Sequence, residues 1–370
     1  MRVAYVVVER VAGNHGVPKK FAYQLAAWRK AGATCELFAA AEDADAPTRL
    51  VEGQIFHRNR LRGPFAQWKE DRRVLSELVE ALDDWKPDLV YLRWGYHKPE
   101  YIKISDRYPT IIEINGDILE TAKLRAKERK GLQRLLGFYV QASLPSLLSR
   151  AAGFIAVTHE VAKLSYLTKY GTPVGVYPNS IDLAEYSVLP FTCDENELPR
   201  IVFIGNFAPW HGLDRVVELG KLTEGRLEID IIGCDAPRES VPSNVTFHGY
   251  LKKEDYSKIF AKASVGLDGL ALFRKRMDEA CPLKIREYLA CGLPFILSAR
   301  DTAFFDHEPD WILRIGNSEN SVKDSVEDIV SFANQMKGRR IPHQETSAFI
   351  DSNVIEGEKV KFFKEILDGK

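Results

Sequence analysis

The chain has 370 residues, of which 45% are hydrophobic and 28% charged, so it is long enough for two ordinary α/β domains. No apolar run reaches the roughly 18–20 residues that a membrane-spanning helix needs, and the first residues lack the pattern of a signal peptide. The five cysteines are scattered and never spaced as C-x2-C, which argues against a disulfide framework and a structural zinc site. We therefore expect a soluble protein of the cytoplasm.

The net charge of -1 hides a basic first half and an acidic second half. Residues 1–185 contain 27 Lys and Arg against 22 Asp and Glu, and residues 186–370 contain 24 against 30. Much of the basic excess lies in residues 119–150, which carry Lys123, Arg125, Lys127, Arg129, Lys130, Arg134 and Arg150. Two interpretations of this segment stay open: a solvated helix face, or a peripheral contact with anionic lipid at the inner face of the membrane. We expect no nucleic-acid partner.

In the first half, short apolar runs alternate with amphipathic stretches, the pattern of buried parallel strands joined by helices. The predicted strands are Val3–Val8, Thr34–Phe38, Leu89–Leu92, Thr110–Ile114 and Phe154–Val157. Helices are predicted over Pro18–Lys30 and over Asp71–Asp84. These units predict a first α/β domain over residues 1–182.

Residues 183–199 interrupt this alternation of strands and helices with two prolines and an acidic cluster, so we expect the interdomain linker there. A second Rossmann-like domain is predicted over residues 200–345. Its predicted strands are Ile201–Ile204, Leu227–Ile232, Val245–His248, Ser264–Leu267, Phe295–Leu297 and Ile312–Ile315. The sequence does not assign the last helix, within residues 356–370, to either domain, and packing back on the first domain is one outcome that we consider.

Residues 200–217 predict a strand that turns through Gly205 into a helix. Glycine lets the backbone approach a ligand closely, and the start of a helix offers free N–H groups to an anion. Doubly wound folds repeat this turn without a ligand as well, so the segment by itself does not identify a site.

The most informative stretch is Glu279-Ala-Cys-Pro-Leu-Lys-Ile-Arg-Glu287, followed by Tyr-Leu-Ala-Cys-Gly-Leu-Pro. It predicts a helix over residues 282–291, because proline suits the first turn and a glycine follows the last. Glu279 then lies before the helix and Glu287 about one and a half turns into it. The N–H groups of Leu283 and Lys284, the helix dipole and the Lys284 ammonium together form a suitable seat for a diphosphate.

This stretch resembles the donor-site signature of glycosyltransferase family 4, retaining enzymes of the GT-B fold. The resemblance extends to Phe-Ile-Gly205, Ile-Ile-Gly233, Phe-His-Gly249-Tyr and, in the first half, Val-Tyr-Pro-Asn179-Ser-Ile-Asp, so it covers essentially the whole chain. It implies two Rossmann-like, doubly wound domains facing across a cleft, with a nucleotide-sugar co-substrate. It also implies no cofactor and no metal, because a helix dipole and cationic side chains stabilise the leaving diphosphate.

The resemblance further implies that Glu287 holds the ribose of the donor and that Glu279 contacts the transferred sugar. The other donor-binding residues that it implies are Gly205, Asn206, His211, Gly249, Tyr250, Cys281, Pro282, Leu283 and Lys284. We expect acceptor-side contacts from the loop after the first strand and from the end of the Leu89–Leu92 strand, where ligands gather in α/β sheets. The acceptor-side candidates are His15, Gly16, Trp94 and Tyr96.

Two departures from the family concern charge. The family usually has Arg directly after the Gly205 position and Lys a few residues later, whereas this chain has Asn206 and His211. One or two fixed positive charges are therefore missing, and a protonated His211 would compensate in part. Cys281 stands where Ser is common and would act as a weak hydrogen-bond donor at the helix start.

A third departure lies in the front domain, where many members place a His that faces the sugar. Here Asn115 and Asp117 occupy the corresponding loop, so we name them with Glu279 as candidate catalytic residues. Asp117 is equally suited to capping the helix that follows it.

We therefore expect a retaining glycosyltransferase that moves a sugar from a UDP- or GDP-sugar to a hydroxyl of a glycan acceptor, a lipid-linked intermediate of surface polysaccharide assembly. Two alternatives stay open. One is a nucleotide-sugar hydrolase or epimerase on the same scaffold. The other is a degenerate sugar-nucleotide or glycan-binding protein, which the replacements at Asn206 and His211 suggest.

Overall fold

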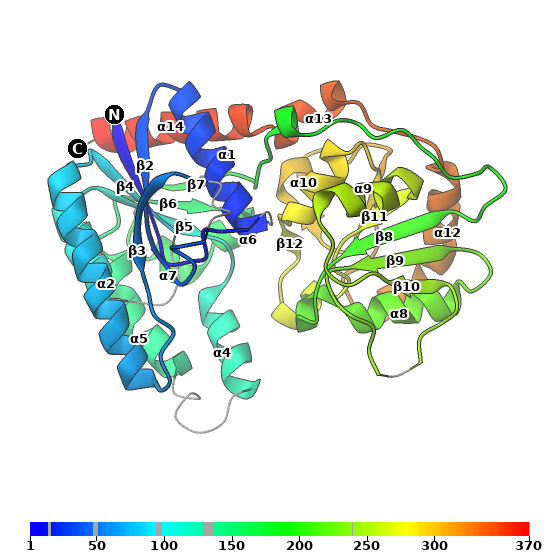
Figure 1. The fold of residues 1–370 in the computed structure, drawn as a ribbon, viewed down its shortest axis with the longest axis horizontal. Helices are drawn as coiled ribbons and strands as arrows, with labels where there is room; N and C mark the ends of the chain where they lie inside the picture. The colour runs from blue at the N-terminus through cyan, green and yellow to red at the C-terminus, as the bar shows by residue number, and fades with distance from the viewer. Residues whose placement is uncertain (14–15, 47–50, 94–97, 129–135, 239, 370) are drawn as a thin grey trace. The chain divides into compact units, whose positions relative to one another are not determined.

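The computed structural model of the chain describes residues 1–13, 16–46, 51–93, 98–128, 136–238 and 240–369. The chain divides into two compact units (Figure 1): unit 1 comprises residues 1–178 and 352–370, and unit 2 comprises residues 179–351. Each unit is built around its own parallel sheet. In the described part of the chain, no helix combines the length and the apolar character needed to cross a bilayer.

Unit 1 contains a seven-stranded sheet in the order β3-β2-β1-β4-β5-β6-β7. Its strands are β1 (Arg2–Val7), β2 (Thr34–Ala41), β3 (Gly53–His57), β4 (Leu89–Arg93), β5 (Thr110–Ile114), β6 (Gly153–Ala156) and β7 (Val174–Val176). The chain starts in the interior of the sheet, runs outward through β2 and β3, and then returns to add β4 on the other side of β1. This is the doubly wound arrangement, in which the direction of winding changes between β1 and β4.

Helices cover the strands of unit 1, which is why the middle strands are buried along almost their whole length and are mostly apolar. These helices are α1 (Gly16–Lys30), α2 (Pro64–Trp85), α3 (Pro99–Arg107), α4 (Ile118–Glu128), α5 (Leu136–Leu148), α6 (His159–Ala162), α7 (Ser165–Thr168) and α14 (Ser352–Asp368). Helix α14, red in Figure 1, packs against α1. There Trp28 Nε1 donates a hydrogen bond of 2.9 Å to buried Glu356, and the Trp28 ring lies 5.3 Å from that of Phe363.

Unit 2 contains a six-stranded sheet in the order β10-β9-β8-β11-β13-β15, wound in the same way around β8 and β11. The strands are β8 (Arg200–Ile204), β9 (Glu228–Ile232), β10 (Val245–Phe247), β11 (Val265–Leu267), β13 (Phe295–Leu297) and β15 (Ile312–Arg314). Two short strands, β12 (Glu279–Ala280) and β14 (Arg300–Asp301), pair separately. The helices are α8 (Leu213–Leu222), α9 (Lys253–Lys262), α10 (Leu283–Ala290), α11 (Ser321–Asp324), α12 (Val326–Gln335) and α13 (His343–Ile350).

Every strand predicted from the apolar runs is confirmed, with ends shifted by up to three residues. Strands β3 and β7 were not predicted, because β3 is only half-buried and β7 has three residues, so neither forms an apolar run. Helix α2 begins at Pro64, seven residues before the predicted start, because its first two turns expose aromatic side chains that do not follow a helical burial pattern.

The segment predicted as a linker, residues 183–199, belongs to unit 2 and is held there by backbone hydrogen bonds. The Leu189 N–H donates to the carbonyl of Cys291 at 3.0 Å, and the Thr192 N–H donates to that of Ala261 at 3.0 Å. The boundary between the units therefore falls after Pro178 and not after residue 182. Proline and acidic residues mark a break in secondary structure, but they do not show that the segment is free of a domain.

Candidate functional site

The strand order of unit 2 places its switch point between β8 and β11. In open α/β sheets, ligands bind beyond the carboxyl ends of the strands at this point, because the loops on either side run in opposite directions and leave space. Here the two ends are followed by Gly205 and Asp268. Any candidate site in unit 2 is therefore built from what surrounds these two residues.

Helix α10 begins beside this switch point. Pro282 occupies the N-cap position in an extended conformation, so the helix starts at Leu283, one residue later than predicted. No side chain from the described residues caps this end. The first N–H groups of the helix, those of Leu283 and Lys284, therefore remain available to an anion, and the positive end of the helix dipole lies with them.

The side chain of Lys284 is buried at the switch point and is only 9% exposed. Its Nζ atom lies 3.3 Å from Asp268 Oδ1, just after β11, and 4.3 Å from the ring centre of Phe203 on β8. No described residue accepts a well-aligned hydrogen bond from this ammonium. Burial lowers the pKa of Lys284, and the carboxylate of Asp268 opposes that shift. The ammonium is thus a desolvated cation with unused donor capacity, which favours an incoming anion.

Tyr288 on α10 joins the ends of the two switch-point strands. Its hydroxyl accepts a hydrogen bond of 2.8 Å from the Ile204 N–H and donates one of 3.2 Å to the Leu267 carbonyl. A Cβ atom on Gly266 would lie 2.3 Å from the Tyr288 ring, so β11 needs glycine at that position. Tyr288 and Asp268 were not predicted as site residues. Asp268 could have been found from its position directly after a buried strand.

Glycines form the turns at the ends of β8, β9 and β10. The Gly205 N–H donates to the Ile232 carbonyl at 2.9 Å, and the Gly233 N–H donates to the Gly249 carbonyl at 2.7 Å. Gly233 has φ 101°, and a Cβ atom there would lie 2.6 Å from the Gly205 carbonyl oxygen, so no other residue fits without movement. The structure thus brings together the predicted Gly205 and Gly249, while Tyr250 next to them is 82% exposed.

Asn206 and His211 lie on one turn after β8, but they do not supply the missing positive charge in this ligand-free structure. His211 Nδ1 accepts a hydrogen bond of 3.2 Å from the Asn206 N–H. Burial, together with the nearby charges of Lys284 and Lys275, lowers the pKa of His211 to about 4. The imidazole is therefore neutral at pH 7 in the structure, and protonation of His211 beside a diphosphate stays a prediction. Asn206 Oδ1 accepts from the Ala208 N–H at 3.0 Å and so shapes the turn.

Cys281 is a buried acceptor, and the expectation that it donates to a ligand is wrong for this structure. Its Sγ accepts hydrogen bonds from the Asn179 N–H at 2.9 Å and from Arg286 Nη2 at 2.8 Å. Arg286 is itself fully buried and pairs with Asp301 through two hydrogen bonds of 2.7 and 2.9 Å. Burial raises the pKa of the Cys281 thiol. The contacts of Cys281, Arg286 and Asp301 therefore hold the segment before α10 against β14, so their role is structural.

Glu279 and Glu287 lie on either side of the start of α10, as the sequence predicted. Glu279 is held in β12, where it pairs with Arg300 of β14, so the segment leading into α10 is anchored. Glu287 lies on α10 and accepts a hydrogen bond of 3.4 Å from the Tyr186 hydroxyl. Both glutamates are partly exposed and therefore accessible to a ligand.

The candidates of the front half belong to unit 1. Asp117 caps α4: its Oδ1 accepts from the Glu120 N–H at 3.1 Å and from the Tyr166 hydroxyl at 3.3 Å. Asn115 is exposed, and Gly16 is the first residue of α1. His15, Trp94 and Tyr96 lie outside the described residues, and so do Arg129, Lys130 and Arg134 of the basic segment.

The switch point of unit 1 holds a buried ion-pair network that was not predicted. Glu113, fully buried at the end of β5, pairs with Lys20 of α1 at 2.7 Å and with Arg93 of β4 at 2.9 Å. Asn115 joins it, because Lys20 donates to its Oδ1 at 3.2 Å and its amide donates to Glu113 at 3.1 Å. Burial lowers the pKa of Lys20 to about 8. Although burial acts in the opposite sense, Lys20 and Arg93 hold the pKa of Glu113 well below its usual range.

The chain is similar to known proteins in two respects: one family model matches part of its sequence, and solved structures match its fold. The model of the family described as glycosyl transferases group 1 matches residues 198–331. No curated protein sequence matches the chain. Among the described residues, no three His, Cys, Asp or Glu side chains are grouped so that they could hold a metal ion.

Solved structures match the chain over its whole length at low sequence identity. The sucrose-phosphate synthase of Thermosynechococcus elongatus is 13% identical with a TM-score of 0.68, and 100% of each chain is covered. The lipopolysaccharide outer core galactosyltransferase WaaB is 12% identical with a TM-score of 0.64, covering 99% of this chain and 100% of that one. HepE of Anabaena, solved in complex with UDP-glucose, is 14% identical with a TM-score of 0.60 over 99% and 100%. The chain has the GT-B fold, and its residues 198–331 match the model of the glycosyl transferases group 1 family.

Proposed function

We propose that the chain is a retaining glycosyltransferase that moves a sugar from a UDP-sugar to a hydroxyl of a glycan acceptor. A lipid-linked intermediate of surface polysaccharide assembly is the acceptor class that we propose. The match of residues 198–331 to the group 1 family model supports the transfer of a sugar. The bound UDP-glucose of HepE and the acceptor named for WaaB, a lipopolysaccharide outer core, support the choice of donor and acceptor class.

The observation that carries this proposal is the buried ammonium of Lys284 at the switch point of unit 2. It lies one residue into an uncapped helix and has only the ion pair with Asp268 among the described residues. A diphosphate placed here would gain charge-assisted hydrogen bonds from the ammonium and from the first N–H groups of α10. Because negative charge grows on the diphosphate as the sugar leaves, these groups would stabilise the transition state more than the ground state.

The two glutamates receive distinct proposed roles. Glu287, on the accessible side of α10, would accept hydrogen bonds from the ribose hydroxyls, and Glu279 would contact the hydroxyls of the sugar. In the proposed reaction the bond between the anomeric carbon and the phosphate oxygen breaks, and both electrons stay with the diphosphate. The acceptor oxygen then bonds to the same face of the carbon, and its proton passes to the leaving phosphate.

In the front unit we retain Asn115 as a candidate contact to the reacting sugar. Its amide donates one N–H to Glu113, and an amide nitrogen carries two, so with respect to the residues that the structure describes one donor is left for a ligand. Asp117 is a weaker candidate, because its Oδ1 already accepts two hydrogen bonds as a helix cap.

The test is a panel of donors, UDP-glucose, UDP-galactose and GDP-mannose, incubated with and without glycan acceptors. We expect UDP-sugar consumption that depends on the acceptor, and a product whose anomeric configuration, read by proton NMR, equals that of the donor. Glu279→Gln and Glu287→Gln should each lower kcat/KM by about 100-fold or more while the melting temperature stays close to that of the wild type.

Three results would contradict the proposal. Donor cleavage that is equally fast without acceptor would make the protein a hydrolase. Isomerisation of the donor sugar would make it an epimerase. Binding of UDP-sugars without turnover for any acceptor would make it the degenerate binding protein considered above.

A further inference from the structure

Three large apolar side chains are exposed together at the start of α2 and in the loop before it. Leu61 is 44% exposed, Phe65 66% and Trp68 41%. The rings of Phe65 and Trp68 lie parallel, within 16°, with their centres 6.2 Å apart. Single exposed apolar residues are ordinary, but an adjacent group of this size marks an interaction surface.

Basic side chains lie among these apolar ones. Lys69 Nζ lies 4.7 Å from the ring centre of Phe65, and the Arg72 guanidinium lies 5.1 Å from that of Trp68. Arg60 and Arg62 are exposed in the preceding loop. We call the whole set the α2 face, and it consists of Arg60, Leu61, Arg62, Phe65, Trp68 and Lys69. Within the part of the chain that the structure describes, the three cations of the α2 face have no carboxylate partner, so the face carries uncompensated positive charge.

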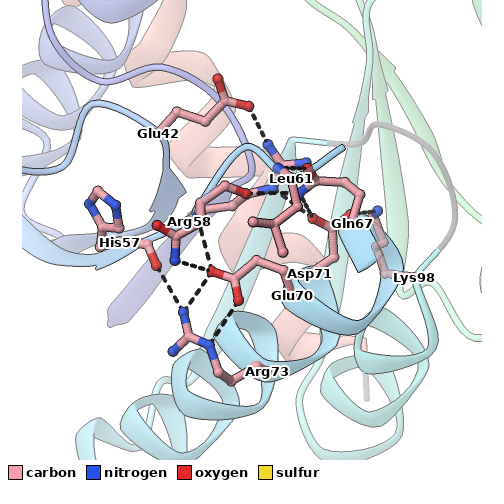
Figure 2. A network of polar contacts seen from close by, with 10 residues as sticks. Glu42, His57, Arg58, Leu61, Gln67, Glu70, Asp71, Arg73 and Lys98 are labelled. Atoms are coloured by element: carbon pink, nitrogen blue, oxygen red, sulfur yellow. Dashed lines mark hydrogen bonds and ion pairs between the residues drawn. The ribbon is translucent and has the colours of Figure 1, made fainter. Parts of the chain in front are cut away.

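The opposite side of the same segment is fixed by a polar network, which Figure 2 shows. Gln67 Oε1 accepts from the Leu61 N–H at 2.8 Å, and Glu70 Oε1 accepts from the Asn59 N–H at 2.9 Å. Arg58 Nε donates to buried Asp71 at 2.7 Å. With Gln67, Glu70 and Asp71 turned inward, the apolar side chains of the first two turns of α2 must point outward. The exposure of the α2 face is therefore built into the fold and does not reflect a loose loop.

A second exposed aromatic pair lies on α5, where Phe138 is 74% exposed and Tyr139 44%. Helices α2 and α5 both pack against α3. Glu100 of α3 lies between them: its carboxylate pairs with Arg72 of α2 at 3.0 Å, and burial together with the nearby charge of Glu100 raises the pKa of Tyr139 on α5. Unit 1 thus presents aromatic side chains from two helices around one supporting helix.

We infer that the α2 face is a docking surface for an anionic lipid bilayer. Aromatic rings and leucine enter the boundary between headgroups and acyl chains, while lysine and arginine extend toward anionic headgroups, so the interleaving of the two kinds of side chain matches a bilayer surface. This surface differs from the basic segment 119–150. It would hold the enzyme where a lipid-linked acceptor of the proposed function lies, but vesicle binding requires no sugar transfer, so the two proposals can fail separately.

The test is sedimentation of the full chain with two kinds of vesicle, one of phosphatidylcholine alone and one of equal parts phosphatidylcholine and phosphatidylglycerol. We expect binding to the anionic vesicles only. Lys69→Glu should weaken the partition coefficient by about fivefold for each unit of charge changed, and Phe65→Ser with Trp68→Ser should weaken it by at least about tenfold. The matched controls are Lys364→Glu and Val354→Ser, exposed positions of α14 in the same unit, which should bind like the wild type.

Two further measurements separate a lost lipid contact from misfolding and test whether the α2 face binds another copy of the chain instead of lipid. Brominated lipid should quench the tryptophan fluorescence of the wild type more than that of Trp68→Phe, which keeps an aromatic ring in place. Equal binding of the wild type and the double serine variant to anionic vesicles would overturn the inference. A change from dimer to monomer in the double serine variant without lipid, measured by light scattering, would also overturn it, because the α2 face would then be an interface between copies of the chain.

Discussion

The two units wind their sheets in the same order, yet the buried cations at their switch points differ in hydrogen bonding. In unit 1 the cations Lys20 and Arg93 each donate a hydrogen bond to the carboxylate of Glu113. In unit 2 the buried Lys284 has one ion pair, with Asp268 at 3.3 Å, and unused donors. The buried cations at the switch point of unit 1 therefore bind a carboxylate of the protein itself. The buried cation at the switch point of unit 2 can still bind the anionic group of a ligand.

The buried cations at the two switch points therefore have different roles. A buried cation that is fully paired contributes to the folded state, and removing its partner leaves an uncompensated charge. A buried cation with unused donors costs stability in the free protein, and the cost is recovered when a ligand binds. The predictions that follow test the comparison by breaking each switch point in turn.

Removing the carboxylate of unit 1 should have the largest effect. Glu113→Leu leaves buried Lys20 without its carboxylate partner and Arg93 with only the half-exposed Glu9 at 4.0 Å, so the free energy of unfolding should fall by about 3–5 kcal/mol. Urea denaturation at neutral pH measures this loss. The control is Glu327→Leu, whose partner Arg226 is exposed, and its effect should be much smaller because solvent screens this pair. Equal losses in the two variants would show that the network does not stabilise unit 1.

The neutral His211 of unit 2 should make the protein less stable in acid. Its pKa is about 4 in the folded protein and about 6.5 in the unfolded chain, so between these values the unfolded chain binds more protons. The stability that this residue contributes is complete above about pH 7 and falls by about 2 kcal/mol at pH 5.

In His211→Gln that part of the pH dependence should disappear. Urea titrations at neutral pH and at pH 5 measure it, with the exposed His307→Gln as the control. If the wild type and His211→Gln lose the same stability between the two conditions, the imidazole is not held neutral by its surroundings.

Loss of the helix cap in unit 1 should have a smaller effect. Asp117→Ala removes the acceptor for the Glu120 N–H and should cost about 1 kcal/mol, while Asp117→Ser keeps a capping oxygen and should recover most of that loss. Chemical denaturation measures both. If the serine variant regains stability but its transfer activity stays 100-fold lower, Asp117 contacts the reacting sugar and is more than a cap.

The strands could be predicted because they are mostly buried on both faces and are therefore rich in apolar residues. Strand β5 was predicted with its observed ends, since all five of its residues are buried. The first two turns of α2 could not be predicted, because their exposed aromatic residues contradict the burial pattern of a surface helix.

The donor side of the candidate site was predicted in part. The helix start that carries Leu283 and Lys284 was predicted to within one residue, because the motif fixes it locally, and their contact with the donor stays a prediction. Asp268, Tyr288 and the network around Glu113 were missed, because they depend on which strand ends meet in space. Cys281 was misassigned for the same reason: its position in sequence suggested a ligand contact, but Arg286 and Asn179 occupy its sulfur.

The central claim is that Lys284 and the start of α10 hold the diphosphate of the donor. Calorimetric titration of the wild type and Lys284→Met with UDP and with uridine tests it most directly, because uridine lacks the diphosphate. The account predicts that the wild type binds UDP more tightly than uridine and that Lys284→Met loses about 10- to 100-fold in UDP affinity, with uridine binding almost unchanged. A Lys284→Met variant that is folded and binds UDP as tightly as the wild type would contradict it.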